Sequence, residues 1–284
     1  MKNIVRTLIY DGQVSLTIAD TTELVKEGAR LHGLSSASTY IFGKALSLMT
    51  FMSACLKNER GEISLSLKGD GTSGEIGVSG NNRLQMRGYI LNTQAKGETN
   101  LDGETKLLCG DVSITIIRDD GYSRPFVGSC ALPPNAGLDE GFEEYFRISE
   151  QLPTRLYSNV VVDQQGKCLF AGVVALQPLP FADSETLKKV DSLDLALILQ
   201  KVEKEGAMYA AKDTFVLDES TLKERFAQYQ CNCSREYLTG VLVSLGEAQM
   251  REIIREEGAV RVHCHYCNTN YEFTSADADA LFSK

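Results

Sequence analysis

Four cysteines near the C-terminus stand in two close pairs whose spacing suits metal binding or thiol redox chemistry. Cys231 and Cys233 form a CxC motif, and Cys264 and Cys267 form a CxxC motif further along the chain. Four thiolates complete the tetrahedral shell of a structural zinc site and leave no open position for a reacting water. An oxidant can also convert paired thiolates into disulfides. The spacing therefore predicts a zinc site that holds a fold together under reducing conditions and releases it under oxidising ones.

Two plainer interpretations of these cysteines stay open: four incidental buried residues, or a stable zinc anchor with no redox role. His263 and His265 flank Cys264 and are potential competing ligands. Because four cysteines already fill a zinc shell, we expect both histidines to be surface or supporting residues. The other cysteines show no ligand spacing, and we expect them to pack in the core. They are Cys55, Cys109, Cys130 and Cys168.

Length, charge and composition limit the class of protein. The 284 residues are enough for one large core domain and a small appended one, and 43% hydrophobic with 24% charged residues is typical of a soluble globular chain. A net charge of −9 without a cluster of Lys and Arg disfavours nucleic acid as a partner. No apolar run is long enough to span a membrane, and the N-terminus lacks a signal-peptide pattern. Free cysteines in close pairs favour a reducing compartment, so we expect a cytoplasmic protein.

The chain up to residue 178 has the pattern of an α+β core domain with a mixed or antiparallel sheet. A hairpin is predicted around Asp11-Gly12, because this pair tolerates the positive φ of a tight turn. Asp20 with Glu23 indicates a helix start that leads to Leu31, and apolar residues at helical spacing predict a helix over 37–56. A further helix is expected over 138–149. Short alternating or β-branched runs predict strands over 62–68, 75–79, 84–90, 111–118, 154–162 and 168–176.

One glycine-rich stretch resembles a dinucleotide-binding fingerprint. The residues from Gly69 to Gly74 match GxGxxG letter for letter. That fingerprint requires a helix directly after it, so that the helix N-terminus meets the pyrophosphate. Here Glu75 to Ser79 has the pattern of another strand. We therefore interpret the glycines as a hairpin loop and expect no nucleotide site.

The composition changes at Pro178 and Pro180, which lack the donor that a helix or central strand needs. From residue 183 to 229 the pattern is largely helical, with a second helical piece expected from Glu219 to about Gln228. We expect three domains: the core over 1–178, a metastable helical linker over 179–230, and a zinc-binding tail over 231–284. The linker has two open interpretations, as ordinary amphipathic helices docked on the core or as a switchable segment that binds other proteins.

The chain as a whole resembles a known family, the redox-regulated heat-shock holdases, also called the thirty-three-kilodalton chaperonins. At the tail the resemblance rests on Cys231-Asn232-Cys233-Ser234-Arg235-Glu236, on Gly258-Ala259-Val260, and on Cys264 to Phe273. At the front it rests on Tyr10-Asp11-Gly12, on Glu27 to Gly33, and on Ile63 to Gly77. It spans nearly the whole length and preserves the order of parts.

The resemblance implies a chaperone of the stress response that is not an enzyme and uses no ATP. It implies that Cys231, Cys233, Cys264 and Cys267 are both the Zn2+ ligands and the redox switch. On oxidation the family pairing gives the disulfides Cys231–Cys233 and Cys264–Cys267, and the oxidised chain is expected to form a homodimer and hold unfolding client proteins. Metal binding contributes about 10–16 kcal/mol to such small modules, so its loss should unfold the tail and weaken the linker.

Two other classes of protein fit parts of the pattern. A zinc ribbon that binds nucleic acid or a transcription partner also uses four cysteines, although the acidic charge opposes it. A thiol-disulfide oxidoreductase uses CxxC at a helix N-terminus that follows a strand. Here a strand is expected after the motif, at Tyr271-Glu272-Phe273, which disfavours that class.

Overall fold

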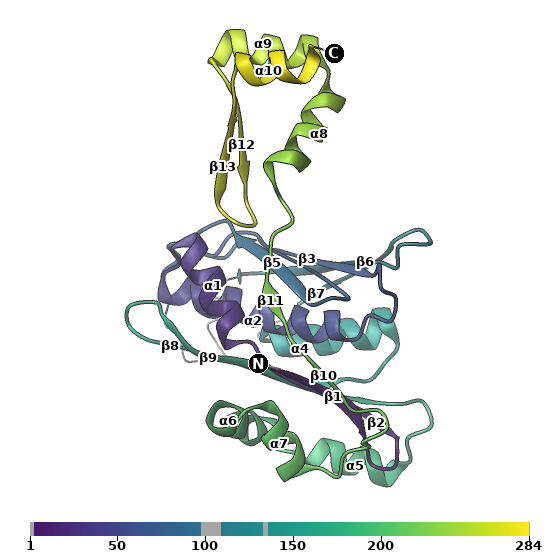
Figure 1. Cartoon of the computed structure of the whole chain (residues 1–284). Coiled ribbons are helices and arrows are strands. Elements are labelled where there is room, and N and C mark those ends of the chain that lie inside the picture. Colours follow the sequence, from purple (N-terminus) through teal and green to yellow (C-terminus); the bar gives the residue numbers. More distant parts are fainter. Residues whose placement is uncertain (1–2, 98–108, 133–135, 284) are drawn as a thin grey trace. The chain divides into compact units, whose positions relative to one another are not determined.

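The fold is taken from a computed structural model of the chain, which describes residues 3–97, 109–132 and 136–283 (Figure 1). The chain divides into two compact units, Met1–Tyr229 and Gln230–Lys284, which we call the core unit and the tail unit. The predicted linker lies within the core unit apart from Gln230, and its separate character remains a proposal. Over the described ranges, every helix is too short or too polar to cross a membrane.

The core unit is α+β, as predicted, with two sheets and helices in alternating layers (Figure 1). The five-stranded sheet is antiparallel and has the order β10-β1-β2-β9-β8. Its strands are β1 (Ile4–Ile9), β2 (Val14–Asp20), β8 (Arg155–Val162), β9 (Cys168–Pro178) and β10 (Lys223–Arg225).

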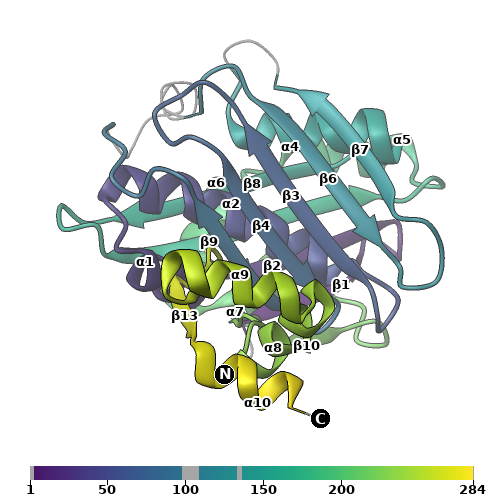
Figure 2. The same cartoon turned by 90° about the horizontal axis from the view of Figure 1, so that it is seen from above.

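The six-stranded sheet has the order β11-β5-β4-β3-β6-β7, and only the pairing of β11 with β5 is parallel among its described strands. Its strands are β3 (Glu62–Lys68), β4 (Ile76–Asn81), β5 (Gln85–Ile90), β6 (Ser113–Asp119), β7 (Phe126–Ala131) and β11 (Gln228–Tyr229). Figure 2 shows β4, β3, β6 and β7 crossing over the helices of the middle layer.

Helices fill the space between the sheets. They are α1 (Thr22–His32), α2 (Ser36–Ala54) and α4 (Leu138–Tyr145), which continues as the π-helical turn η1 (Phe146–Glu150). Helix α2 begins at Ser35, whose side chain accepts a hydrogen bond from the Ser38 amide. Sequence periodicity predicted one apolar stripe on α2, but the helix is buried on all sides because a sheet covers each flank.

A second apolar layer lies on the other face of the five-stranded sheet. Helices α5 (Ser184–Ser192), α6 (Leu195–Glu205) and α7 (Ala207–Thr214) cover this face (Figure 1). The sheet contributes buried side chains such as Val5, Leu16 and Val174, and the helices contribute Ile198 and Leu199. The helices of the predicted linker therefore form a second hydrophobic core together with this face of the five-stranded sheet.

Two turns behave as the sequence predicts. Tyr10, Asp11 and Gly12 all have positive φ, at 52°, 53° and 81°, and they join β1 to β2 in a hairpin. The stretch from Gly69 to Gly74 connects the antiparallel strands β3 and β4, and no helix follows it. The hairpin interpretation of the GxGxxG match is therefore confirmed.

Two expectations need correction. Strand β7 was not predicted, because its Gly128, Ser129 and Cys130 interrupt any apolar alternation. The expected helix from Glu219 to about Gln228 is wrong, since this stretch forms β10 and β11 instead. These short strands add to exposed sheet edges, and such pairing depends on partners far along the chain that local helix propensity does not reveal.

The tail unit is a small α+β module with its own core. It contains α8 (Arg235–Leu245), α9 (Glu247–Glu257), the antiparallel strands β12 (Val260–Cys264) and β13 (Thr269–Phe273), and α10 (Ser275–Phe282). Its described core has five buried side chains, which are Leu242, Met250, Val260, Phe273 and Ala278. Arg235 links α8 to the hairpin and to α10, because it lies over the Phe273 ring of β13 at 4.4 Å and pairs with Asp277 of α10 at 2.7 Å.

Candidate metal centre

The four cysteines of the two motifs come together in the tail unit. Cys231 and Cys233 precede α8, Cys264 ends β12, and Cys267 lies in the turn that leads into β13. Asn268 takes a positive φ of 54°, which helps to reverse the chain so that Cys264 pairs with Thr269 in the hairpin. The four Sγ atoms all lie within 4.8 Å of one another.

The sulfur geometry fits a tetrahedral metal ion. Zinc at about 2.3 Å from each of four sulfurs sets those sulfurs about 3.8 Å apart. The Sγ atoms of Cys231 and Cys264 are 3.7 Å apart, and those of Cys233 and Cys267 are 3.1 Å apart. Each contact joins one cysteine from the CxC pair to one from the CxxC pair, as expected of four corners around one centre. The cluster could therefore hold a metal ion.

The electrostatics of the cluster favour a cation. Burial raises the pKa of Cys231 and of Cys233, although the hydrogen bond with Tyr271 partly opposes the rise at Cys233. At Cys267, burial also acts to raise the pKa, but hydrogen bonds with Thr269 and Cys233 outweigh it and leave the pKa lowered. Four sulfurs this close repel one another as thiolates, and a bound divalent cation removes that repulsion.

Two residues that the sequence did not single out support the sulfurs. The Tyr271 hydroxyl lies 3.3 Å from the Cys233 Sγ, and this contact raises the pKa of Tyr271 to about 12. The Thr269 hydroxyl lies 3.2 Å from the Cys267 Sγ. Both residues stand two apart on β13, so they share the face that the cysteines occupy. That period-two spacing directly after Cys267 is the signal that could have identified them.

The histidines take supporting positions. Neither His263 nor His265 belongs to the group of four possible ligands among the described residues. The His263 Nδ1 lies 3.0 Å from the Asn270 Oδ1, and the two histidine rings pack at 5.1 Å. The expectation that they are not competing ligands agrees with this placement.

The remaining cysteines pack in the core unit, as predicted. Cys109 and Cys168 are buried in the core between the sheets, and Cys55 and Cys130 pack against it. Burial raises the pKa of Cys109 to about 11 and that of Cys168 to about 12. Because the thiolate is the reactive form, these two side chains are poor nucleophiles at neutral pH.

The fold and the site define a class: a two-unit α+β protein whose small unit carries four clustered cysteines that could hold a metal ion. The family model described as "Hsp33 protein" matches residues 2–274. A 33 kDa chaperonin of Bacillus cereus is 32% identical over 98% of this chain and 97% of the relative, and one of Bacillus cytotoxicus is 31% identical over the same shares. The chain belongs to the Hsp33 family of chaperones.

A solved structure shows the same fold. The crystal structure of the 33 kDa chaperonin (heat shock protein 33 homolog) of Thermotoga maritima matches with a TM-score of 0.84. The match covers 99% of this chain and 98% of that chain at 24% sequence identity. The chain therefore shares its fold with that protein over nearly its whole length.

Proposed function

We propose that this chaperone is an ATP-independent holdase that is inactive while reduced and zinc-bound and is activated by oxidation. The observation that carries the proposal is the group of four Sγ atoms within 4.8 Å in a unit whose described hydrophobic cluster has five buried residues. Sulfur ligands in fourfold coordination favour Zn2+ over harder cations such as Mg2+ or Ca2+. Cys231, Cys233, Cys264 and Cys267 are the proposed ligands, with one Zn2+ per chain.

The proposed activation converts thiolates into disulfides. A peroxide oxidises one thiolate of a pair to a sulfenic acid, and the second thiolate displaces hydroxide to form the S–S bond. Each pair of thiolates loses two electrons to one peroxide as its disulfide forms, so two peroxide equivalents produce Cys231–Cys233 and Cys264–Cys267. Sulfurs in these bonds no longer hold Zn2+. All four Sγ atoms lie within 4.8 Å of one another, so the two sulfurs of each motif are already close before oxidation.

Loss of the metal should unfold the tail unit. Five buried side chains form a small core, and metal binding supplies about 10–16 kcal/mol in comparable modules. We propose that unfolding then spreads into the linker over 179–230. Departure of α5, α6 and α7 would uncover the face of the five-stranded sheet that holds Val5, Leu16 and Val174. That apolar face is a suitable surface for unfolding client proteins.

The remaining parts of the proposal follow from family membership and from the sequence. The chain resides in the reducing cytoplasm and stays inactive there until oxidative stress. The oxidised chain forms a homodimer and uses neither nucleic acid nor a membrane as partner. The hairpin position of the CxxC motif also opposes a disulfide-exchange enzyme, because Cys264 ends a strand and β13 follows.

An aggregation assay tests the proposal. Light scattering from a thermally unfolding client protein is measured with the chain reduced and zinc-loaded, or treated with peroxide. We expect suppression of scattering only after peroxide treatment, without nucleotide, together with release of one Zn2+ per chain. Equal suppression by the reduced chain would refute the switch, and disulfides between the two motifs in a peptide map would refute the pairing.

A further inference from the structure

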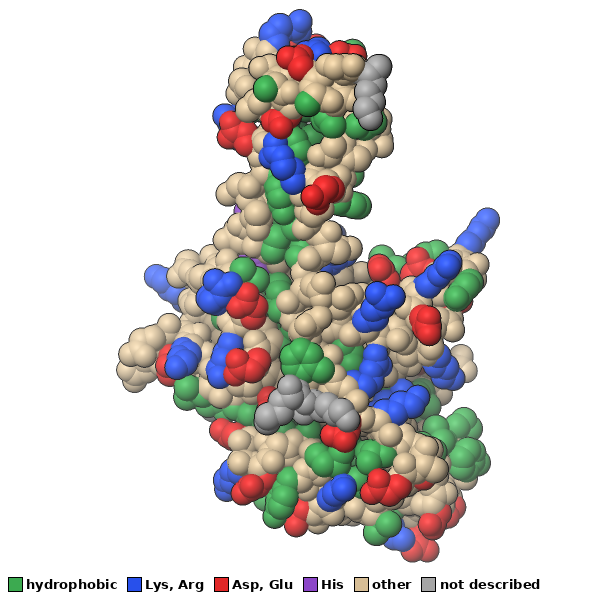
Figure 3. Space-filling model, in the orientation of Figure 1, with side chains coloured by type: hydrophobic (Ala, Val, Ile, Leu, Met, Phe, Trp, Pro, Cys, Tyr) green, Lys and Arg blue, Asp and Glu red, His purple; other side chains and the backbone are tan. Residues whose placement is uncertain are grey.

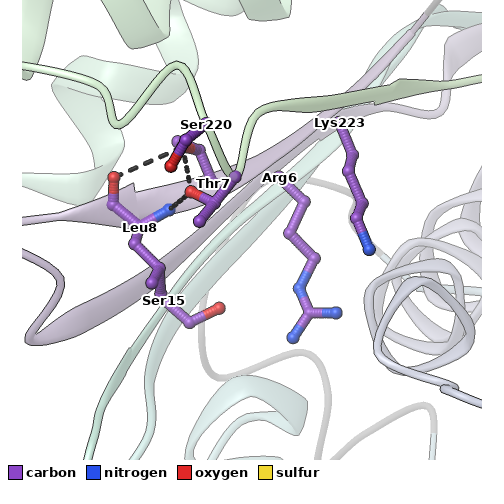
Figure 4. Close-up of a pocket in the computed structure, with 7 residues that line it drawn as sticks. Arg6, Thr7, Leu8, Ser15, Ser220 and Lys223 are labelled. Atoms are coloured by element: carbon purple, nitrogen blue, oxygen red, sulfur yellow. Dashed lines mark hydrogen bonds between the residues drawn. The ribbon is translucent and has the colours of Figure 1, made fainter.

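A basic pocket lies where the end of the linker meets the first hairpin of the core unit. It has a volume of about 310 Å3, at the lower end of the range for small-molecule sites. Strands β1, β2 and β10 and the segment before β10 form its walls (Figure 4). The lining residues are Arg6, Thr7, Leu8, Ser15, Ser220, Thr221 and Lys223.

Two cationic side chains lie side by side in this pocket. Arg6 and Lys223 are directly opposite residues on the antiparallel strands β1 and β10, and Figure 4 shows their side chains extending to the same side. Arg225 follows two residues later on the same face, and burial together with the charge of Arg6 lowers the pKa of Arg225. Like charges placed opposite each other on paired strands destabilise the pairing. Figure 3 shows several Lys and Arg side chains gathered in this part of the core unit.

Among the described residues, no acidic side chain forms an ion pair with Arg6, Lys223 or Arg225. Arg6 donates one hydrogen bond to the carbonyl oxygen of Ala54 at the end of α2, and Arg225 donates to that of Asn82. These carbonyls satisfy part of each guanidinium but carry no net charge. The positive charge of the pocket is therefore not balanced within the described core unit.

Nearby acids are engaged elsewhere. Glu219 pairs with Lys212 at 4.0 Å, and the Asp218 carboxylate accepts hydrogen bonds from the amide and the hydroxyl of Ser220. Glu224 is the residue next to Lys223 on β10, and because successive side chains of a strand point to opposite faces, it lies on the other face from Lys223. None of these carboxylates lines the pocket.

A buried hydroxyl completes the polar lining. Ser15 is only 7% exposed, and the structure gives its side chain no hydrogen-bond partner among the described residues. It lies opposite Leu8 in the hairpin, and Figure 4 shows its oxygen directed toward the Arg6 side chain. Ser15 therefore lies on the other side of Arg6 from Lys223, and its hydroxyl is a suitable third donor for an oxyanion.

We propose that this pocket binds a small phosphate-bearing anion, held by Arg6, Lys223 and Ser15. The planar guanidinium of Arg6, the ammonium of Lys223 and the hydroxyl of Ser15 are all groups that donate hydrogen bonds to phosphoryl oxygens. The volume accommodates more than a single phosphate, so a diphosphate group fits the site better.

The position of the pocket adds a regulatory consequence, which rests on the proposed function. Arg6 and Ser15 belong to the first hairpin, whereas Lys223 belongs to the segment that follows α7. A bound anion therefore ties β10 to β1. By linkage, any ligand that binds only the paired state raises the free energy needed to separate the strands. The anion would thus hold the linker docked and oppose activation.

Calorimetric titration of the reduced, zinc-loaded full chain with sodium pyrophosphate tests the site, with ionic strength matched by sodium chloride. We expect saturable binding of one pyrophosphate per chain, about tenfold weaker in Lys223→Gln and about threefold weaker in Ser15→Ala. Lys223 is exposed, so its replacement should not disturb folding. Lys212→Gln, on α7 and paired with Glu219, is the matched control and should bind like the parent chain. A parallel titration with inorganic phosphate measures how much the second phosphoryl group contributes to the binding affinity.

Absence of saturation, or equal affinity in the parent and Lys223→Gln chains, would overturn the site. Hydrogen exchange of the amides from Thr221 to Arg225 measures the coupling between anion binding and the pairing of β10 with β1. Pyrophosphate should slow this exchange in the parent chain but not in Lys223→Gln. Saturable binding without slower exchange would overturn the coupling. Neither measurement uses oxidation or a client protein, so failure here leaves the proposed chaperone switch untouched, and failure of the switch leaves the binding site untouched.

Discussion

The Tyr229 hydroxyl donates to the Gly88 carbonyl oxygen at 2.7 Å and accepts from the Gly88 amide at 3.1 Å. The His32 Nε2 joins the same cluster at 3.2 Å from the hydroxyl. The Tyr229 ring also packs so closely on Gly28 that a Cβ there would lie 3.1 Å from it. Tyr229 ends the core unit and stands two residues before Cys231. This contact therefore anchors the chain just ahead of the proposed metal ligands.

Tyr229→Phe should loosen this anchor. The change removes the hydroxyl acceptor of a backbone amide, which costs about 1–3 kcal/mol when the group is left buried. We expect faster hydrogen exchange at Gln228 and Tyr229 in the reduced chain and a lower peroxide requirement for chaperone activity. Tyr209→Phe, on an exposed tyrosine of α7, is the control and should leave both measurements unchanged.

Replacing one proposed ligand should release the metal and unfold the tail unit. Cys264→Ser leaves three thiolates, so we expect less than one zinc per chain by metal analysis and loss of tail-unit signals in NMR spectra. Cys130→Ser is the control, because Cys130 packs against the core between the sheets. Full zinc content in the Cys264→Ser chain would show that this residue is not a ligand.

Tyr271→Phe should weaken metal binding without abolishing it. The hydroxyl contact at 3.3 Å lowers the pKa of Cys233, so its loss should make that sulfur easier to protonate and a poorer ligand. Loss of such supporting hydrogen bonds typically costs 10- to 100-fold in metal affinity. Competition with a chromogenic chelator measures the change. Tyr237→Phe, on an exposed tyrosine of α8, should retain the parent affinity.

Two leucines on α6 test the role of the linker helices. Leu199 is 1% exposed and Leu197 is 50% exposed. Leu199→Ala should destabilise docking of α6 on the five-stranded sheet by about 2–5 kcal/mol and permit client protection without peroxide. Leu197→Ala should behave like the parent chain in the same light-scattering assay. Equal behaviour of the two variants would argue against the sheet face as the client surface.

A chain that ends at Gln230 should retain a folded core. The cores between the sheets and beneath α5 to α7 are formed by residues up to Tyr229. We expect a cooperative thermal transition by circular dichroism, a less stable linker, and chaperone activity that no longer needs oxidation. A chain without secondary structure would show instead that the core unit depends on the tail unit.

The structural features that depend on local sequence pattern could be predicted from the sequence. Asp11-Gly12 specifies its hairpin through backbone conformation alone, and the CxC and CxxC spacing identified all four clustered sulfurs. The failures involve distant partners. The residues of β10 pair with β1, and Tyr229 bonds to Gly88, across separations that no local periodicity records. Tyr271 was interpreted only as a strand residue because its contact with Cys233 exists only after the hairpin closes.

The segment from Lys223 to Tyr229 adds an edge strand to each sheet, β10 beside β1 and β11 beside β5. When this segment leaves, β1 and β5 become outer strands with unsatisfied backbone donors and acceptors. Exposed edge strands of this kind can form main-chain hydrogen bonds with any extended polypeptide, whatever its side chains. Release of one short stretch would therefore provide two templates for main-chain pairing, which suits a protein that must recognise clients of unrelated sequence.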